Sequence, residues 1–510
     1  MVPRMMSFAF DNSFARELPS FYVKWEPDRV PGPRLRYLNH ALAEELRLDI
    51  GRQDAATLAD MLSGNRLPEG AEPIAQAYAG HQFGRFSPQL GDGRALLVGE
   101  VIDCHDKRRD IAFKGSGPTP FARNGDGKAA LGPMLREVLI SEALHALGIP
   151  TTRALAVVAT GEAVRREQLL PGATLTRVAA SHIRVGTFEY YASRGDHVRV
   201  RRLADYTLAR HDPGLIGKEG RYLDFLGAVI DRQAALVAQW MGVGFIHGVM
   251  NTDNMSIPGE TIDYGPCAFM EAYDPTSVFS SIDRHGRYAY QNQPNIAQWN
   301  LTRLAESLLP LLADDEEDAV ALASEAIASF DGRYQRYWLD VMRAKVGLNN
   351  RVPNGAGGDD EDLTLIEEWL ALLQSNRVDF TLAWRHLADA AEGTPLPLRD
   401  LFADRVALDV WLKKWQTRCA TEEGRTDSDE SRSAASTRAN TMRRSNPWLI
   451  PRNHCVEDAL SAASDHADFG PFEQLLNALK NPYEAHAEFV RFSKPAPASF
   501  TASYCTFCGT

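Results

Sequence analysis

The residues from 245 to 265, which read FIHGVMNTDNMSIPGETIDYG, include the side chains with the clearest capacity for chemistry. Asp253 and Asn254 stand side by side, and Asp263 follows in an Ile-Asp-Tyr-Gly turn. Carboxylate and amide oxygens are ligands that hard cations such as Mg²⁺ and Mn²⁺ prefer. Because protein-bound Mg²⁺ is usually shared with the phosphates of a substrate, these three oxygen ligands predict a metal and nucleotide site.

The spacing within this stretch can be compared with that of protein kinases. Their His-Arg-Asp-x-x-x-x-Asn loop carries the catalytic base and a metal-binding asparagine, and an Asp-Phe-Gly sequence supplies another metal ligand. His247 and Asn254 keep this spacing, but Val249 occupies the position of the base. Asp253 is the one carboxylate of the loop, so ordinary kinase chemistry is not expected. We interpret His247 as a core residue that braces the loop, with a role as the base as the alternative.

A predicted β-hairpin lies upstream, where the apolar run ALLVGEV follows a glycine-rich turn and precedes a second run, DIAFKGSG. In the turn, Gly91 and Gly93 would let backbone N–H groups approach phosphate oxygens, and Arg94 would add a positive charge. A plain tight turn explains the same two glycines without any ligand. The hairpin is therefore a candidate phosphate site only in combination with other residues.

Lys114 ends the second run, in the place where a kinase presents its phosphate-binding lysine. The next segment, GPMLREVLISEALHALG, predicts a helix from which Glu137 or Glu142 could orient that lysine. Glu137 is preferred, and the alternative is that both acids are surface charges. The small-residue loop between strand and helix places Asp126 and Gly127 where they could face a nucleotide, although a flexible connector has the same composition.

Two arginines, Arg177 and Arg184, are seven residues apart in the segment LTRVAASHIRVGTFEYY. In a helix this spacing would place both guanidinium groups on one face, where they could hold a terminal phosphate. If the segment is not helical, nothing follows from the spacing. An amphipathic helix is predicted over residues 222–242, directly before the catalytic stretch. Its expected buried face contains Leu226, Ile230, Val237 and Met241.

The composition is that of a globular protein, with 510 residues, 44% hydrophobic residues and 9% aromatic residues. The net charge of −12 argues against a general nucleic-acid binder. The longest uncharged run, residues 233–252, contains polar residues and continues an amphipathic helix, so we expect protein core and not a membrane span. The N-terminus lacks the continuous apolar segment of a signal peptide, and we expect a cytoplasmic monomer.

The C-terminal third is predicted to be mostly helical, with residues 422–440 as an exposed loop because they contain few apolar side chains. Cys505 and Cys508 form a C-x-x-C pair near the chain end. Without a second pair for zinc, a redox-active dithiol is the preferred interpretation. Cys267 could form a disulfide with either of them, and the alternative is that Cys267 is a small buried hydrophobe.

These segments together resemble the selenoprotein O family, whose bacterial members are the YdiU-like proteins. The resemblance covers most of the chain from residue 78 onward. Its motifs are YAGHQFG, PQLGDGRA, FKGSGPTPF, HGVMNTDNM, IDYGP, NQPNIAQWNL, NPWLIPRNH and the terminal C-x-x-C. It implies an α+β, protein-kinase-like fold of two lobes: residues 1–75 form an N-terminal extension, 76–185 a mostly β N-lobe that binds the nucleotide, 186–345 a helical C-lobe with the catalytic loop, and 346–510 an additional helical region with the redox tail.

The resemblance also implies the activity, in which ATP binds in a reversed orientation and AMP is transferred to Ser, Thr or Tyr hydroxyls of proteins. Asp253 would be the base, ionised in the resting site, and Asn254 with Asp263 would hold Mg²⁺ or Mn²⁺. The implied nucleotide-binding residues are Lys114, Arg177, Arg184, Gly91, Gly93, Arg94, Asp126, Gly127 and Asp263. A kinase-like phosphotransferase and an inactive nucleotide-binding pseudokinase with a redox tail are the two alternatives.

Overall fold

An antiparallel sheet dominates the first part of the computed structural model, which describes residues 8–51, 53–348, 358–423 and 428–507. Within these residues the strand order is β1-β3-β6-β7-β10-β9-β2, and the short β8 pairs with β10. The strands are β1 (Tyr22–Lys24), β2 (Arg34–Leu38), β3 (Ile74–Gln76), β6 (Ala95–Ile102), β7 (Arg108–Lys114), β8 (Ala129–Ala130), β9 (Arg153–Arg165) and β10 (Leu169–Ala179). Strand β6 pairs with β7 as the predicted hairpin, and Ala95 lies opposite Lys114.

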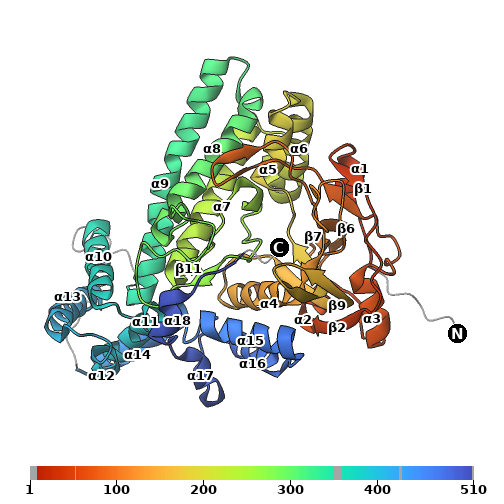
Figure 1. The fold of residues 1–510 in the computed structure, drawn as a ribbon. Coiled ribbons are helices and arrows are strands. Elements are labelled where there is room, and N and C mark those ends of the chain that lie inside the picture. The colour runs from red at the N-terminus through yellow and green to blue at the C-terminus, as the bar shows by residue number, and fades with distance from the viewer. Residues whose placement is uncertain (1–7, 52, 349–357, 424–427, 508–510) are drawn as a thin grey trace.

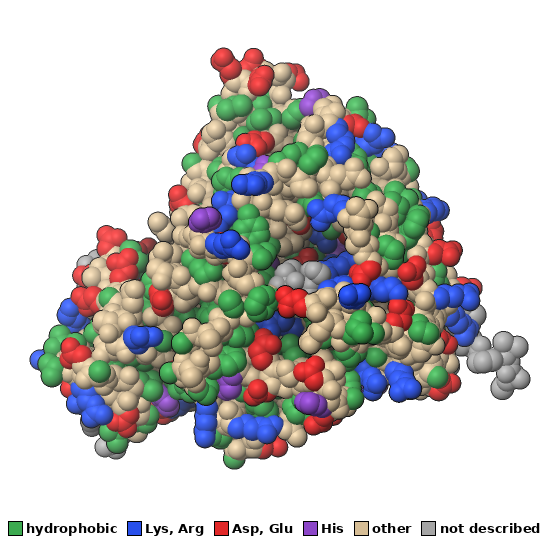
Figure 2. All heavy atoms as spheres, viewed as in Figure 1, with side chains coloured by type: hydrophobic (Ala, Val, Ile, Leu, Met, Phe, Trp, Pro, Cys, Tyr) green, Lys and Arg blue, Asp and Glu red, His purple; other side chains and the backbone are tan. Residues whose placement is uncertain are grey.

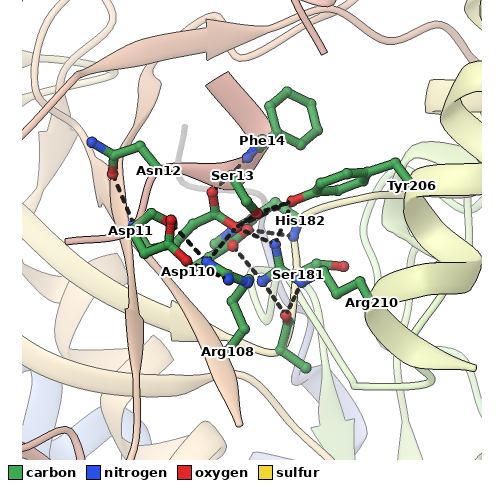
Figure 3. A network of polar contacts seen from close by, with 12 residues as sticks. Asp11, Asn12, Ser13, Phe14, Arg108, Asp110, Ser181, His182, Tyr206 and Arg210 are labelled. Carbon is green, nitrogen blue, oxygen red and sulfur yellow. Dashed lines mark hydrogen bonds and ion pairs between the residues drawn. The ribbon is translucent and has the colours of Figure 1, made fainter. Parts of the chain in front are cut away.

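Residues 1–75 contribute more to the sheet than their sequence indicates, because β1 and β2 form its two edges. Three helices accompany them: α1 (Ser13–Glu17), α2 (His40–Glu45) and α3 (Ala55–Ser63). The start of α1 is fixed by a buried charge, since the backbone N–H of Phe14 and the hydroxyl of Ser13 both donate to Glu100 on β6. Figure 3 shows this network, in which Arg210 lies beside the same strands.

A long buried helix, α4 (Leu131–Ala146), packs on β9 and β10. Its inner positions, among them Leu135, Val138, Leu139 and Leu144, are at most 1% exposed. Two late helices, α15 (Asn453–His466) and α16 (Gly470–Leu479), pack on the other side of α4 (Figure 1). Helix α4 is thus held between the sheet and the C-terminal part of the chain.

The second part of the chain is largely helical, and α7 (Arg221–Val243) lies at its centre. The predicted inner face of this helix is buried: Leu226, Ile230 and Val237 are 0% exposed and Met241 is 6% exposed. Helices α8 (Gln293–Leu312) and α9 (Glu316–Val346) pack on it, and α5 (Val185–Ala192) and α6 (His197–His211) pack on α8. Gly244 ends α7 with a φ of 71°, a value that favours glycine, and the chain enters β11 (Phe245–Ile246), which pairs with β12 (Ala268–Phe269). This pairing closes the loop of the catalytic stretch at its base.

The C-terminal region adds further helices around a core of tryptophan side chains: Trp369, Trp384, Trp411 and Trp415 are each at most 2% exposed. The remaining helices are α10 (Asp359–Asn376), α11 (Phe380–Ala391), α12 (Leu396–Arg399), α13 (Arg405–Glu423), α14 (Ser428–Ser445), α17 (Val490–Ser493) and α18 (Ala498–Ser503). The prediction of a loop over 422–440 is wrong, because α14 occupies most of it. Ala439 and Met442 are 0% exposed there, so tertiary burial outweighs the polar composition.

A small hairpin of β4 (Gly80–Gln82) and β5 (Arg85–Ser87) leaves the main sheet and contacts the helical part. His81 on β4 packs edge-on against Trp299 of α8 with ring centroids 5.2 Å apart. The hairpin also contacts α5 and the short 3₁₀ helix η2 (Thr252–Asn254) of the catalytic stretch. It therefore carries residues from the first part of the chain to the catalytic loop. Across the described ranges, no helix combines the length and the apolar character that crossing a membrane requires.

Candidate active site

A cavity of about 1180 Å³ lies between the sheet and the helical part, and Figure 2 shows a hollow at the centre of the face, bordered by Lys and Arg side chains. The candidate residues that line this cavity are Gly91, Gly93, Arg94, Lys114, Asp126, Gly127, Glu137, Arg177, Arg184, Asp253, Asn254, Asp263 and Cys505. Cys508 lies outside the described residues. The structure thus brings together candidates from segments far apart in the sequence, from Gly91 to Cys505.

Asp263 is the point where the positive charges meet. Its Oδ1 atom accepts from Lys114 Nζ at 2.7 Å and from Arg177 at 2.8 Å. Burial alone would raise the pKa of Asp263, but the charges of Lys114, Arg177 and Arg184 hold it well below its usual range. The backbone at Asp263 has a φ of 66°, a strained value for a residue other than glycine. The carboxylate is therefore ionised and fixed in place.

Lys114 is held from its other side by Glu137, which accepts a very short hydrogen bond from Nζ. Both side chains are buried, and Lys114 comes from the end of β7 while Glu137 comes from α4. Glu142, the other candidate partner, pairs with Arg153 at 2.7 Å. The Oε2 atom of Glu137 is buried without a hydrogen-bond partner. The geometry accordingly selects Glu137 as the residue that orients the lysine.

Arg177 and Arg184 line the cavity, but they do not lie in one helix. Arg177 lies in β10, and Arg184 is the extended residue directly before α5, so they share no helix face. Arg184 lies 3.4 Å from Asp92 and its Cζ atom is 4.3 Å from the centre of the Tyr78 ring. The condition of a shared helix is therefore not met, but both guanidinium groups still line one cavity, since the chain turns between the strand and the helix.

A histidine that the sequence reasoning missed lies behind Arg177. The Nε atom of Arg177 donates to His182 Nε2 at 3.2 Å, and His182 Nδ1 donates to Asp110 at 2.9 Å. Asp110 also accepts from Arg210 at 2.6 Å. Asp110, His182 and Arg210 belong to the buried network of Figure 3, which extends to Glu100 and the segment before α1. No local motif signals this network, because Asp110 lies 72 residues from His182 and 100 residues from Arg210.

Asp253 has a carboxylate with one free oxygen. Its Oδ2 atom accepts from Gln82 at 3.3 Å, whereas its Oδ1 atom is buried with no hydrogen-bond partner. Burial raises the pKa of Asp253 to about 6. A Cβ atom at Gly80 would lie 2.6 Å from that Oδ1 atom, and one at Gly186 would lie 2.1 Å from Ala79 O. These two glycines, also missed from the sequence, allow the hairpin to reach Asp253.

In the loop, Asn254 is available as a metal ligand and His247 has a structural role. Asn254 donates through Nδ2 to Val249 O at 3.0 Å, which fixes the amide and leaves its Oδ1 atom available. His247 is 1% exposed, its Nε2 atom donates to Ile262 O at 2.9 Å, and its Nδ1 atom faces the backbone N–H of Val249. His247 therefore braces the loop. The amide oxygen of Asn254 and the ionised carboxylate of Asp263 form an all-oxygen donor set that fits Mg²⁺ or Mn²⁺.

The glycines of the two cavity loops are required by packing within the protein. Gly91 has a φ of 74°, and a Cβ atom there would lie 2.3 Å from the Phe121 ring. A Cβ atom at Gly93 would lie 2.8 Å from Phe121 O, and one at Gly127 would lie 2.1 Å from Pro118 N. The carboxylate of Asp126 forms an ion pair with Arg166 at 2.8 Å. These four residues line the cavity, but their identities follow from loop packing as well as from any ligand.

The end of the described chain lies against the same site. Thr506 donates to Pro266 O at 2.7 Å, and Arg136 donates both to Tyr504 at 3.2 Å and to Cys267 O at 2.8 Å. Cys505 is exposed at the cavity, whereas Cys267 is buried and its thiol donates to Tyr264 O at 3.1 Å. Burial raises the pKa of the Cys267 thiol to about 12. The thiol is therefore protonated at neutral pH, and its pairing with the tail stays a prediction.

The chain with this mixed α+β fold is a nucleotidyltransferase, as comparisons with known proteins show. A family described as "Protein adenylyltransferase SelO" matches residues 4–480. The protein nucleotidyltransferase YdiU of Chromobacterium violaceum is 56% identical over 494 residues, 97% of this chain and 100% of the relative. The YdiU protein of Cereibacter sphaeroides is 57% identical over 509 residues, 99% of this chain and 100% of the relative, and that of Methylorubrum populi is 54% identical over 511 residues, 99% of each. The chain belongs to the SelO family of protein adenylyltransferases, which confirms the resemblance seen in the sequence.

Proposed function

We propose that this nucleotidyltransferase uses ATP to attach AMP to Ser, Thr or Tyr hydroxyls of proteins, with release of pyrophosphate and with Mg²⁺ or Mn²⁺ as the metal. One observation carries the proposal: Asp253, whose Oδ1 atom has no hydrogen-bond partner, lines the cavity in which Lys114, Arg177 and Arg184 gather around Asp263. A carboxylate that can take a proton thus shares one space with groups that can hold a polyphosphate.

In this proposal Lys114, Arg177 and Arg184 bind the phosphates of ATP. Gly91, Gly93, Arg94, Asp126 and Gly127 complete the nucleotide pocket, which their positions along the cavity support. Asn254 and Asp263 would hold the metal ion, which would add positive charge beside the phosphates. Because Lys114 and Arg177 are paired with Asp263 in the structure, they are already oriented toward the place where that charge is needed.

Asp253 acts as the general base in the proposed reaction. Its carboxylate takes the proton of the acceptor hydroxyl as the hydroxyl oxygen forms a bond to the α-phosphorus. The bond from that phosphorus to the oxygen that bridges to the β-phosphate breaks, and the electron pair leaves with pyrophosphate. The positive side chains stabilise the charge that grows on this leaving group. A buried carboxylate with a pKa of about 6 is a suitable base near neutral pH.

The proposal includes a protein-kinase-like architecture with residues 76–185 as N-lobe and 186–345 as C-lobe, after an extension of 1–75 and before a helical region of 346–510. It is supported by the pair of Lys114 on a strand and Glu137 on α4, which corresponds to the strand lysine and helix glutamate of kinases. The asparagine and aspartate of the loop at 247–263 occupy the corresponding sequence positions. The proposal also includes a monomeric enzyme, which light scattering of the purified protein would test.

The products of the reaction test this function. The enzyme is incubated with ATP, Mg²⁺ or Mn²⁺ and a cell lysate, and modified proteins are examined by peptide mass spectrometry while pyrophosphate is measured. We expect AMP adducts on Ser, Thr or Tyr and pyrophosphate release that depends on Asp253. Phosphorylated residues with release of ADP would instead support the phosphotransferase alternative, and modification of neither kind would support the inactive pseudokinase.

A further inference from the structure

The β4–β5 hairpin and the loop before α8 carry three arginines, and the two segments meet at Gly84 and Arg287. Arg85 is exposed at the start of β5, Arg284 is exposed in the loop, and Arg287 is half-buried under the hairpin. The guanidinium carbon of Arg287 is 3.5 Å from the position that a Cβ atom on Gly84 would occupy. We call Arg85, Arg284 and Arg287 the arginine patch.

Arg287 is held by aromatic rings and not by a carboxylate. Its Cζ atom lies 4.8 Å from the centre of the Trp299 ring and 5.7 Å from that of Tyr288. Stacking of this kind orients a guanidinium group while leaving its edge free for an anion. The Nε atom of Arg287 is buried with no hydrogen-bond partner. The side chain is therefore fixed in place with donor capacity to spare.

The carboxylates of this neighbourhood already have partners. Asp283 is 6% exposed and accepts from the backbone N–H groups of Arg287 at 2.9 Å and Tyr288 at 2.8 Å. Glu306 pairs with Arg303 at 2.8 Å. Over the described part of the chain, no Asp or Glu lies within ion-pair distance of the three patch arginines. The patch thus keeps an uncompensated positive charge, although the whole chain carries a net charge of −12.

The arginine patch is connected to the catalytic loop by short contacts. Phe83 at the tip of the hairpin packs on Tyr288 with ring centroids 5.0 Å apart, and both residues bond to Asn251, two positions before Asp253. Gln82 of the same hairpin contacts Asp253 itself. The patch therefore borders the side of the cavity where the acceptor hydroxyl must approach the base, whereas the phosphate-binding side chains lie around Asp263.

We infer that the arginine patch binds acidic side chains that flank the acceptor hydroxyl, so that the enzyme prefers acidic segments of protein substrates. This inference rests on the proposed function, since it concerns the acceptor of the same reaction. A polypeptide that places its hydroxyl at Asp253 has to pass over the hairpin or the adjoining loop. Two apolar side chains at that rim, Ile282 and Phe86, are 53% and 41% exposed and can contact the same segment. Arginine recognises carboxylates through paired hydrogen bonds, which gives the patch its selectivity.

Synthetic peptides that share one central Ser, Thr or Tyr and differ only in flanking Glu, Gln or Lys residues test the inference. Transfer of α-labelled AMP to each peptide is measured as kcat/KM at two salt concentrations. Since exposed ion pairs are worth less than about 1 kcal/mol each, we expect a preference for Glu over Lys of about three- to tenfold that shrinks in high salt. In the doubly substituted Arg85→Glu/Arg284→Glu enzyme the order should reverse, because both exposed side chains change sign.

Two further variants separate charge from folding. Arg287→Lys should keep much of the preference and Arg287→Gln should lose part of it, while the KM for ATP stays unchanged in both. Arg405→Gln, at an exposed arginine in α13, serves as the control and should behave as wild type. Equal labelling of the three peptides would overturn the inference. Labelling of proteins but of no peptide would do the same, and both results would leave the proposed function standing. If neither proteins nor peptides receive α-label, the proposed function itself fails.

Discussion

The guanidinium group of Arg177 is fixed from behind by His182, whose Nε2 atom accepts from Arg177 Nε at 3.2 Å. Burial lowers the pKa of His182, although Asp110 opposes this effect through its hydrogen bond to Nδ1. The neutral ring with its proton on Nδ1 is the form that offers Nε2 as an acceptor. Asp110 and His182 are therefore positioning residues for an arginine that we propose binds phosphate.

The first prediction concerns this contact. His182→Ala should raise the KM for ATP by about tenfold, because Arg177 loses its alignment. His182→Gln should recover part of the loss, since its amide can both accept from Arg177 and donate to Asp110. Steady-state kinetics on both variants provide the measurement. If His182 were needed only for folding, kcat would fall with the folded fraction and the KM would not change.

A second prediction follows from the pKa of Asp253. As general base, Asp253 must be ionised, so kcat/KM should fall as the pH drops below about 6 and stay level above it. Asp253→Ala should reduce kcat by roughly 10²- to 10⁴-fold while ATP binding, measured by calorimetry, is retained. If the residual activity of Asp253→Ala still fell below a pH of about 6, the pH dependence would arise from another group.

The same carboxylate should reduce the stability of the fold at neutral pH. Burial raises the folded-state pKa of Asp253 to about 6 from its usual 3.8. Folding favours the protonated form of Asp253. The contribution of this protonation to the free energy of unfolding is therefore fully present below pH 3.8 and is lost as the pH rises through 6. Asp253→Asn stays neutral, and we expect its Tm to exceed that of wild type by about 1 to 3 °C at pH 7.5 but not at pH 4. Asp465→Asn, at an exposed carboxylate beside the cavity, controls for the loss of one negative charge. Equal Tm values for wild type and Asp253→Asn at pH 7.5 would show that the ionised carboxylate is not destabilising.

Two glutamates of α4 form a matched pair for a fourth prediction. Glu137→Gln should raise the KM for ATP and lower kcat, because Lys114 loses the charge that orients it. Glu142→Gln changes the same residue type in the same helix but affects the pair with Arg153, not Lys114. We expect a loss of about tenfold or more in kcat/KM for the first variant and little change for the second. Similar kinetics for both variants would exclude the orienting role of Glu137.

Much of the fold could be predicted from hydrophobic periodicity. The hairpin of β6 and β7, the helix α7 and its buried face all follow from local patterns of apolar residues. The edge strands β1 and β2 could not be predicted, since they are short and are defined by their partners β3 and β9. Helix α14 was missed because its sequence is polar and its few buried side chains meet residues far away in the chain.

In the site, too, residues that belong to short motifs could be predicted, and residues that long-range packing brings to the cavity could not. Lys114, Asp253, Asn254 and Asp263 stand out because each belongs to a short motif with a chemical reason for its spacing. Gln82 and the network behind Arg177 carry no such signal, because long-range packing alone brings them to the cavity. The seven-residue spacing of Arg177 and Arg184 would have placed them together only in a helix, but a strand and the residue before α5 bring both to the cavity of Asp263.

Transfer of label from ATP tests the central claim most directly. The purified enzyme is incubated with acceptor proteins and with ATP labelled at either the α- or the γ-phosphorus, in parallel with the Asp253→Ala variant. The account predicts that proteins acquire α-label and no γ-label, and that the variant transfers far less of the α-label. Transfer of γ-label without α-label would contradict it, because the base and the phosphate-binding side chains would then be serving phosphoryl transfer.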